Sequence, residues 1–396
     1  MKKIVLLIVF SLFLVIFIPK SPVQVSAVSG SSEFRPGSAR LARLLGADGA
    51  EGYRQVVAPR QFTFPQDHGP HPGYRNEWWY VTGNLDGENE ERFGFELTLF
   101  RFSVTPGIEP DDSAWRSNQV YIGHFAITDR AANEFRVATR YSRGSLGLAG
   151  AQSDPFRVWL EDWHLSAAPV AGPDGQAGNA WHLRANDKDI AIDLLLRSRQ
   201  SPVLNGIDGL SKKSALEGNA SYYYSIPRMQ TTGTLRSGKK SYVVSGLSWL
   251  DREWGSAGLS TGQQGWDWFA LQLSDGSSLM FYNLRKIDGT RDEFSAGTFI
   301  AADGTATALS RDDVAIDVLD TWDSPAGGRY PMAWRMTVAS HDLSLRITPI
   351  MRGQELATRV RYWEGAVDVE GEYRDTAIRG RGYVELTGYA ADPGGV

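Results

Sequence analysis

The sequence predicts an all-β protein made of antiparallel sheets or barrels, and three observations lead to this prediction. The 396 residues include 42 glycines and 13 tryptophans, a composition typical of many short strands joined by tight turns. Segments in which apolar and polar residues alternate recur along the chain, and they end at Gly, Pro, Asp or Asn. Long helical patterns do not alternate with these segments, which disfavours parallel βαβ units.

The expected strands form two groups separated by a loop-rich segment. That segment, 200–221, contains several Pro, Asn and Gly residues and is typical of a linker or a lid. Strands are expected at 77–85, 92–103, 120–128, 156–165, 180–185, 190–197, 232–235, 241–250, 266–273, 278–285, 293–301, 333–340, 343–349, 363–373 and 382–388. Chain length suggests roughly two domains. The expected division is a leader at 1–27, a leading arm at 28–59 with a short helical pattern, a first domain at 60–235 and a second at 236–396.

The N-terminus reads as a secretory signal peptide. Lys2 and Lys3 precede an apolar run at 4–18, and a small-residue pattern predicts cleavage after Ala27. A single membrane anchor is the alternative, but the run is shorter than the roughly 18 to 20 residues that a spanning helix needs. We therefore expect export, to the periplasm or the medium. Residues 30–34 resemble a cloning junction, which leaves open whether the leader is native or belongs to a vector.

Composition excludes several kinds of chemistry. The chain has no cysteine, so disulfides, zinc–thiolate sites, iron–sulfur clusters and a thiol nucleophile are excluded. Removing Lys2, Lys3 and Lys20 with the leader takes the formal charge from -5 to -8, and nucleic acid is not an expected partner. No phosphate-binding loop or dinucleotide fingerprint is present, and we expect no cofactor.

The segment 246–271 is the first candidate for a functional site. It sets four tryptophans among several carboxylates in what we expect to be one hairpin. Strand alternation places Trp249, Asp251 and Glu253 on one face. Neighbouring aromatic rings would desolvate Asp251, raise its pKa and allow it to donate a proton. The alternative is a structural Asp-Arg-Glu ion-pair cluster that closes a barrel. The other aromatic residues expected at the site are Trp254, Trp266 and Trp268.

Two further segments have a similar character. In the first, 74–85, Arg75 and Glu77 stand beside Trp78 and Trp79 in a strand pattern, and these four side chains are expected to contact substrate. The second is a run of three tyrosines at the expected domain junction, where ligand sites are common. Alternation points Tyr222 and Tyr224 the same way and Tyr223 elsewhere; core packing is the alternative role.

Histidine and serine motifs give weaker signals. His68 and His71 have a spacing that metal ligands can show, but Pro70 and Pro72 prevent a helix, so hydrogen-bonded loop histidines are favoured and no metal site is predicted. His68 beside an aspartate could still shuttle a proton or contact substrate. Two Gly-Ser-x-Gly runs, 144–147 and 255–258, lack the complete nucleophile elbow, so a serine triad is not supported.

Several ordered motifs together resemble one family. They are HPGYRNEWWY at 71–80, FGF at 93–95 with Phe100-Arg101, DREWG at 251–255, GWDWF at 265–269 and GYVELTGY at 382–389. With them the chain resembles the carotenoid 1,2-hydratase (hydroxyneurosporene synthase)-like family with two lipocalin-like domains, which includes predicted secreted hydrolases. The resemblance spans about residues 60–390. It implies two calycin-type antiparallel β-barrels packed together, with an apolar pocket at or near their interface.

The resemblance also implies a site and a range of activities. Relatives include hydratases that add water to an isoprenoid or flavonoid alkene and pericyclases that fold a polyene. In the hydratases an aspartate protonates the alkene, and Asp251 matches it by position, with Trp249 as an aromatic neighbour. Tyr222 and Tyr224 fall where His and Trp are expected, a departure that separates this chain from the carotenoid hydratases themselves.

The sequence therefore predicts an exported enzyme that acts on an apolar, isoprenoid or polyene-like molecule. The reaction would be alkene hydration or isomerisation with Asp251 as proton donor and the developing cation facing Trp249, Tyr222 and Tyr224. Two alternatives remain open. One is a non-catalytic lipocalin-like carrier of a hydrophobic ligand, and the other is a pericyclase that forms carbon–carbon bonds. Peripheral membrane contact and the oligomeric state are also left open.

Overall fold

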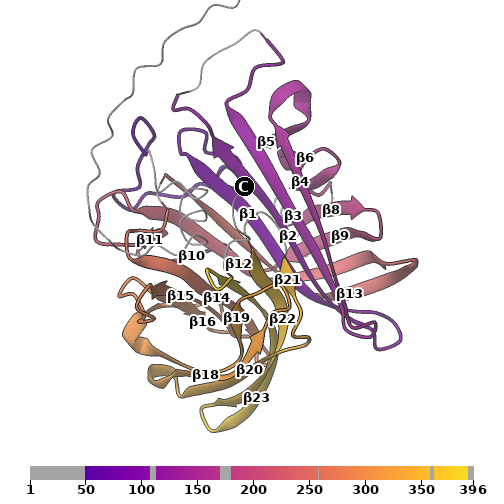
Figure 1. Ribbon diagram of the computed structural model, residues 1–396, viewed down its shortest axis with the longest axis vertical. Coiled ribbons are helices and arrows are strands. Elements are labelled where there is room, and N and C mark those ends of the chain that lie inside the picture. The colour runs from indigo at the N-terminus through magenta and orange to yellow at the C-terminus, as the bar shows by residue number, and fades with distance from the viewer. Residues whose placement is uncertain (1–49, 108–112, 170–179, 257, 357–360, 391–396) are drawn as a thin grey trace, which may run out of the picture. The chain divides into compact units, whose positions relative to one another are not determined.

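The computed structural model describes residues 50–107, 113–169, 180–256, 258–356 and 361–390. The expected signal peptide, the helical pattern at 39–45 and most of the leading arm lie outside these residues. The described part of the chain consists of strands, short 3-10 turns and loops, arranged as two antiparallel sheets (Figure 1). The predicted all-β architecture of two antiparallel β units is confirmed.

The first sheet contains 13 strands in the order β4-β3-β2-β1-β13-β12-β9-β8-β7-β6-β5, with β10 and β11 paired to β12. Its strands are β1 (Asn76–Asp86), β2 (Arg92–Ser103), β3 (Gln119–Asp129), β4 (Glu134–Arg143), β5 (Ala149–Ser153), β6 (Phe156–Leu160), β7 (Trp163–Ala167), β8 (Ala180–Asp187), β9 (Ile190–Ser198), β10 (Val203–Leu204), β11 (Leu210–Lys212), β12 (Ala220–Ser237) and β13 (Lys240–Gly255). Strand β6 packs across β2, β3 and β4, so this sheet curls over its own apolar face as a half-barrel.

The second sheet contains 10 strands in the order β17-β16-β15-β14-β23-β22-β20-β19-β18, with β21 paired to β22. Its strands are β14 (Gln263–Leu273), β15 (Ser278–Lys286), β16 (Ala296–Ile300), β17 (Ala306–Ser310), β18 (Val314–Asp323), β19 (Arg329–Val338), β20 (Leu343–Pro349), β21 (Glu355–Leu356), β22 (Tyr362–Tyr373) and β23 (Thr376–Thr387). The 3-10 turns are η1 (Gln66–His68), η2 (Ser145–Gly147), η3 (Arg311–Asp313) and η4 (Ala339–His341). Because η3 joins the edge strands β17 and β18 directly, the sheet nearly closes on itself, as the ring of strands in Figure 1 shows.

Most expected strands are present, and β2 and β20 match the expected bounds residue for residue. The expected strand at 156–165 is two strands, because Glu161 takes a positive φ of 59° and turns the chain between β6 and β7. Strands β4, β17 and β18 were not expected, since many of their residues are exposed and their alternation is weak.

The prediction of a single hairpin at 246–271 is wrong. Strand β13 pairs with β1 and β12 in the first sheet, whereas β14 pairs with β15 and β23 in the second. The chain therefore passes from one sheet to the other between Gly255 and Gln263. The expected domain boundary at 235/236 falls inside the β12–β13 hairpin, whose two long strands stay in the first sheet.

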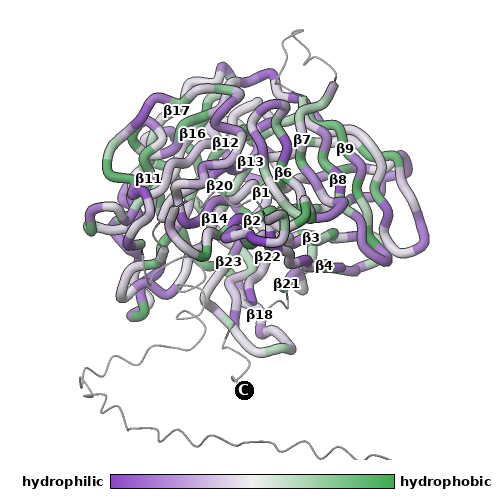
Figure 2. Tube along the Cα trace, turned by 90° about the horizontal axis from the view of Figure 1, so that it is seen from above, coloured by the Kyte–Doolittle hydropathy of each residue, from purple (hydrophilic) through white to green (hydrophobic). Residues whose placement is uncertain are grey.

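Four apolar clusters occupy the interior of the described residues, the smallest of them made of Ala126, Leu356 and Tyr362. One fills the first sheet, one fills the second, and a third lies between the sheets around Tyr80, Trp249 and Trp268. Figure 2 shows hydrophobic and hydrophilic residues mixed along β8, and burial alternates residue by residue along β9. Each sheet thus buries one face in its own core, and the strands at the junction bury both faces.

Polar contacts fix how the sheets meet. The Asn84 side chain donates to the Gly382 carbonyl at 2.9 Å, and the Thr128 hydroxyl donates to Gln354 Oε1 at 2.7 Å. Strand β12 bends beside this junction at a bulge between Ile226 and Met229, which contains Pro227. Proline has no backbone N–H to donate to a neighbouring strand, so a long strand accommodates it at a bulge.

Candidate active site

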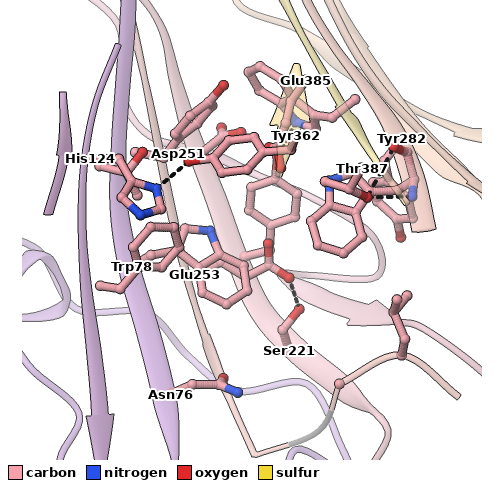
Figure 3. Close-up of a pocket in the computed structure, with 18 of the residues that line it drawn as sticks. Asn76, Trp78, His124, Ser221, Asp251, Glu253, Tyr282, Tyr362, Glu385 and Thr387 are labelled. Carbon is pink, nitrogen blue, oxygen red and sulfur yellow. Dashed lines mark hydrogen bonds between the residues drawn. The ribbon is translucent and has the colours of Figure 1, made fainter. Parts of the chain in front are cut away.

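A cavity of about 600 Å³ lies between the two sheets. Figure 3 shows side chains from both sheets pointing into it. Its surface is largely aromatic and aliphatic, with four carboxylates and one lysine. The lining residues used below are Trp78, Tyr80, Thr98, Phe100, Phe102, Val120, Ile122, His124, Tyr141, Lys213, Ser221, Tyr223, Asp251, Glu253, Trp266, Trp268, Tyr282, Tyr362, Glu364 and Glu385.

Strand register gives the cavity an apolar outer wall on β2 and β3, while Glu253 on β13 lies in the same row as Phe100. On the first sheet, Phe102 and Val120 are partners near the strand ends, and Phe100 pairs with Ile122 one row further in. Deeper still, Tyr80 pairs with Asp251 on one side and with Thr98 on the other. Because side chains two residues apart face the same way, these rows form one continuous wall. A ligand would place its apolar part along the outer rows and its reacting part against the inner rows.

Asp251 is held at the inner end by three hydrogen bonds. Its Oδ1 accepts from Trp249 Nε1 at 2.7 Å and from the Ser225 hydroxyl, and its Oδ2 accepts from the Tyr223 hydroxyl at 2.6 Å. The residue is only 2% exposed. Burial raises the pKa of Asp251 to about 7, and this effect outweighs the three donors, which favour the carboxylate. Asp251 can therefore exist in either protonation state near neutral pH.

Tyr223 connects Asp251 to the second sheet. Its hydroxyl accepts from Trp268 Nε1 at 3.1 Å while it donates to Asp251. An indole N–H can only donate, so it fixes one acceptor position of the tyrosine oxygen. Burial raises the pKa of Tyr223 well above its usual value, and the hydroxyl stays protonated. Tyr223 is a neutral donor aimed at the carboxyl.

The wall from the second sheet carries two carboxyls side by side. Glu364 on β22 and Glu385 on β23 are register partners that both face the cavity. Burial raises the pKa of Glu385 to about 8, and the charges of Asp251 and Glu253 act in the same direction. Burial also raises the pKa of Glu364 well above its usual range, and the charge of Glu385 adds to the effect.

Hydroxyl and imidazole groups from the first sheet meet this pair. Tyr80 donates to Glu364 Oε2 at 2.7 Å. His124 Nδ1 is hydrogen-bonded to the Tyr362 hydroxyl, and burial lowers the pKa of this imidazole to about 4. The inner end of the cavity is thus rich in groups that can carry protons without carrying charge.

Lys213 balances one of the four carboxylates. Its ammonium lies 3.0 Å from Glu253 Oε1 and 4.2 Å from the centre of the Tyr282 ring. Burial acts to lower the pKa of Lys213, but Glu253, Tyr282 and Asp251 together outweigh this effect and raise the pKa. Ser221 also donates to Glu253. Lys213 and Glu253 form an ion pair at the cavity wall, whereas burial raises the pKa of the carboxyls further in.

An ionic cluster lies directly behind Asp251, on the other face of β13. Glu77 is fully buried and pairs with both Arg101 and Arg252. Burial acts to raise the pKa of Glu77, but the two guanidinium groups outweigh it and hold the pKa well below the usual range. His71 stacks on Trp254, with ring centroids 3.8 Å apart. Because Arg252 follows Asp251 in the chain, this cluster anchors the strand that presents the acid.

Some predicted site residues lie at the cavity. Trp78, Glu253, Trp266 and Trp268 line it together with Asp251. Trp249 supports Asp251 through its indole N–H. Asp251, Glu253 and Trp249 share one face of β13, as the alternation predicted, while the intervening Leu250 packs in the core of the first sheet.

The structure places the other predicted residues elsewhere. Tyr222 and Tyr224 share a face, but it is the core face of the first sheet, and Tyr223 lines the cavity in their place. His68 Nδ1 lies 2.6 Å from the Tyr224 hydroxyl within that core. Arg75 lies just before β1, where its backbone N–H donates to the Ser256 hydroxyl at 3.2 Å. The remaining residues on the core side are Glu77, Trp79 and Trp254.

Within the described residues, no three or more His, Asp or Glu side chains are arranged to hold a metal ion. In the same part of the chain, no helix has the length and apolar character needed to cross a membrane.

The model of the AttH-like family matches residues 55–389, which include both sheets and every cavity residue named above. The chain belongs to the AttH-like family. The family resemblance read from the sequence motifs is consistent with this match and with the relatives described next.

Individual relatives of this AttH-like chain include one bacterial structure and two fungal enzymes. The crystal structure of a protein assigned as AttH from Nitrosomonas europaea is 32% identical, covers 85% of this chain and 99% of its own, and superposes with a TM-score of 0.74. Dehydratase asqC of Emericella nidulans is 23% identical over 216 residues, 52% of this chain and 60% of its own. Kievitone hydratase of Fusarium solani subsp. phaseoli is 23% identical over 211 residues, 51% of this chain and 58% of its own. The matched part thus spans less than two thirds of either fungal enzyme.

Several cavity residues of this AttH-like chain were not predicted from sequence. They are Tyr80, Thr98, Lys213, Tyr223, Tyr282, Tyr362, Glu364 and Glu385, together with the apolar residues of the outer rows. Glu385 lies inside the GYVELTGY motif, so a carboxylate between the two apolar residues Val384 and Leu386 in that strand was a usable signal. Glu364 had no such signal, because only the β22–β23 register brings it beside Glu385.

The raised carboxyl pKa values predict that stability falls as pH rises from 7 to 9. The folded protein retains protons on Asp251 and Glu385 to about pH 7 and about pH 8, whereas the unfolded chain releases them near pH 4. The stabilisation that these two protons provide is fully present below the pKa of the carboxyls in the unfolded chain. It is lost as pH rises through the pKa of the same carboxyls in the folded protein. Chemical denaturation should show a loss of about 2 kcal/mol across this interval. A Glu385→Gln protein should show a shallower decline, and a flat profile for the unsubstituted protein would contradict the prediction.

Proposed function

We propose that this protein is an enzyme that adds water to, or removes it from, a carbon–carbon double bond of an apolar small molecule. One observation carries the proposal. Asp251 is a buried carboxyl with a pKa of about 7 at the inner end of a largely aromatic cavity. A carboxyl that can be neutral at pH 7 is the group needed to protonate a weakly basic carbon.

Asp251 would exchange the proton at carbon. Its Oδ1 already accepts two hydrogen bonds, so the proton would sit on Oδ2, the oxygen that faces Tyr223. When Asp251 gives up the proton, the same three donors stabilise the carboxylate. The rings of Trp268 and Trp78 line the cavity and would face the positive charge that develops on the substrate.

The character of the cavity supports an apolar substrate. Phe100, Phe102, Val120 and Ile122 form its outer wall, and Tyr141 adds a further ring. A volume of about 600 Å³ lies within the range of small-molecule sites. The names of the two fungal relatives, a dehydratase and a hydratase, support water addition or removal as the reaction. An isoprenoid or polyene-like substrate is part of this proposal.

The first test is conversion by the unsubstituted protein. A panel of linear isoprenoid polyenes and prenylated flavonoids, each with its hydrated alcohol, would be incubated in water labelled with heavy oxygen and followed by chromatography and mass spectrometry. We expect at least one pair to interconvert, with solvent oxygen in the alcohol. If compounds bind and are released without chemical change, that result would favour the hydrophobic-carrier alternative. A new carbon–carbon bond formed without water would favour a pericyclase.

Export is a separate proposal that rests on the leader sequence alone. The apolar run at 4–18 and the pattern before Ala27 support secretion to the periplasm or medium. N-terminal sequencing of the protein made in its native host would show a mature chain that begins at Val28 if the leader is cleaved there.

A further inference from the structure

The cavity carries proton-bearing carboxyls on two opposite walls. Asp251 belongs to β13 of the first sheet, whereas Glu364 and Glu385 belong to β22 and β23 of the second. All three line the same cavity, and Figure 3 shows Asp251 and Glu385 at the same end of it. A flat substrate between the sheets would therefore present one face to Asp251 and the other to Glu385.

Free acceptor positions distinguish the two acids. The three hydrogen bonds to Asp251 leave its Oδ2 one free lone pair, enough for a single proton. Glu385 has one side-chain donor, the indole of Trp266, and keeps part of its surface accessible inside the cavity. Glu385 can thus accept a hydrogen bond from a water molecule or a substrate hydroxyl, while Asp251, once protonated, has no acceptor position left and can only donate its proton.

Water addition needs two proton transfers. One proton goes to carbon, and another leaves the oxygen that attacks the neighbouring carbon. We propose that Glu385 exchanges the proton of this oxygen, on the wall opposite Asp251, so that hydrogen and hydroxyl join or leave opposite faces of the double bond. This assignment rests on the function proposed above and adds a second catalytic residue and a stereochemical course to it.

The bonds and protons balance in each direction. In hydration, the Asp251 O–H bond breaks as a C–H bond forms from the double bond, which leaves a cation and an Asp251 carboxylate. Water then forms the C–O bond, and one of its O–H bonds breaks as Glu385 takes the proton. In dehydration, Glu385 protonates the leaving hydroxyl and Asp251 removes the proton from carbon. Exchange with solvent protons restores the starting state.

The protonation states agree with this division. Burial raises the pKa of Asp251 to about 7 and that of Glu385 to about 8, so each carboxyl can hold or release a proton near neutral pH, as the two directions of the reaction require. Glu364 beside Glu385 contributes a further proton, because two adjoining buried carboxyls do not both ionise. The titratable groups that interact with Glu385 are Asp251, Glu253, Glu364, Glu96, Tyr80 and Tyr362.

Crossed partial reactions test the assignment. The probes are a prenylated isoflavone and its tertiary alcohol, in heavy water or in water labelled with heavy oxygen. Glu385→Gln should lower alcohol formation at least about 100-fold and still exchange solvent deuterium into the alkene, since Asp251 acts alone in that exchange. Asp251→Asn should exchange the alcohol oxygen with solvent but form no alkene. For the stereochemical test, one of the two methyl groups of the prenyl double bond carries carbon-13, so that both carbons of the product are stereocentres. In the unsubstituted protein, deuterium and hydroxyl should then appear on opposite faces of the product.

The controls separate this inference from the proposed function. Glu372→Gln changes an exposed glutamate on β22 in the same way and should retain full activity. If the unsubstituted protein converts the probes and Glu385→Gln does so equally well, or if addition occurs on one face, the role of Glu385 is wrong while the function stands. If the unsubstituted protein converts neither probe, the proposed function fails for this substrate class, and with it the chemistry assigned to Glu385.

An infrared measurement without substrate provides an independent check. At a pH between about 7 and about 8, a band from a neutral carboxyl should disappear in Glu385→Gln and persist in Glu372→Gln. No loss of that band would show that Glu385 holds no proton at this pH, and its assignment as the acid of dehydration would be overturned whatever the substrate. Circular dichroism of each protein establishes that the variants fold.

Discussion

Replacing Asp251 by asparagine is expected to lower turnover of an apolar alkene or its alcohol at least about 100-fold, because the proton at carbon loses its carrier. The fold should persist. The amide oxygen of asparagine can accept from Trp249 and Ser225 as Oδ1 does now, and its NH₂ can donate to the Tyr223 oxygen. Steady-state kinetics on the converted compound, together with thermal unfolding, would measure the two effects.

The hydroxyl of Tyr223 provides the matched control. Tyr223→Phe keeps the ring and removes one donor to the Asp251 carboxylate, so it should lower turnover less than Asp251→Asn does. Ligand affinity should change little in either variant, because the apolar wall is untouched. An Asp251→Asn protein that folds and turns over normally would exclude Asp251 as the acid.

Replacing Glu77 by glutamine is expected to destabilise the protein by about 3 to 5 kcal/mol. Glu77 and Arg252 have no exposed side-chain surface, and Arg101 has 1%. Removing the carboxylate leaves two buried guanidinium groups without their counter-charge. One of them, Arg252, already has an Nε without a hydrogen-bond partner among the described residues. Denaturant titration should show a large fall in the transition midpoint.

The ion pair between Arg92 and Asp368 is the matched control for Glu77. It also joins Arg and a carboxylate, but the side chains are 19% and 44% exposed. Water screens such pairs, so Asp368→Asn should cost about 0 to 1 kcal/mol. Equal losses from Glu77→Gln and Asp368→Asn would contradict the view that burial makes the Glu77 cluster important.

Sequence patterns predicted the strands well where one face of a strand is buried. Strand β2 combines alternation with clear turn residues at both ends, and its bounds were predicted without error. Strand β18 has mostly exposed or half-buried side chains and two register irregularities, so its sequence carries little periodic signal. The link from β13 to β14 was mistaken for a hairpin because local sequence cannot show that a chain leaves one sheet for another.

The tyrosine run shows the same limit within the site. Alternation correctly separated Tyr223 from Tyr222 and Tyr224. Which of the two faces lines the cavity depends on where the second sheet packs. The two-residue period of a strand does not predict that packing. The aspartate at 251 was found because its own strand also carries Trp249 and Glu253.

The sequence by itself determined the all-β class, the family, most strands and Asp251 as the candidate acid, since these depend on local periodicity and on ordered motifs. The tertiary structure decided which wall each side chain joins. Glu364 and Glu385 are 21 residues apart in the chain and become neighbours through β22–β23 pairing, and Tyr80 reaches Glu364 only across the junction of the sheets. Long-range strand pairing and sheet packing create the cavity and raise the pKa of its acids, because both remove the carboxyls from water.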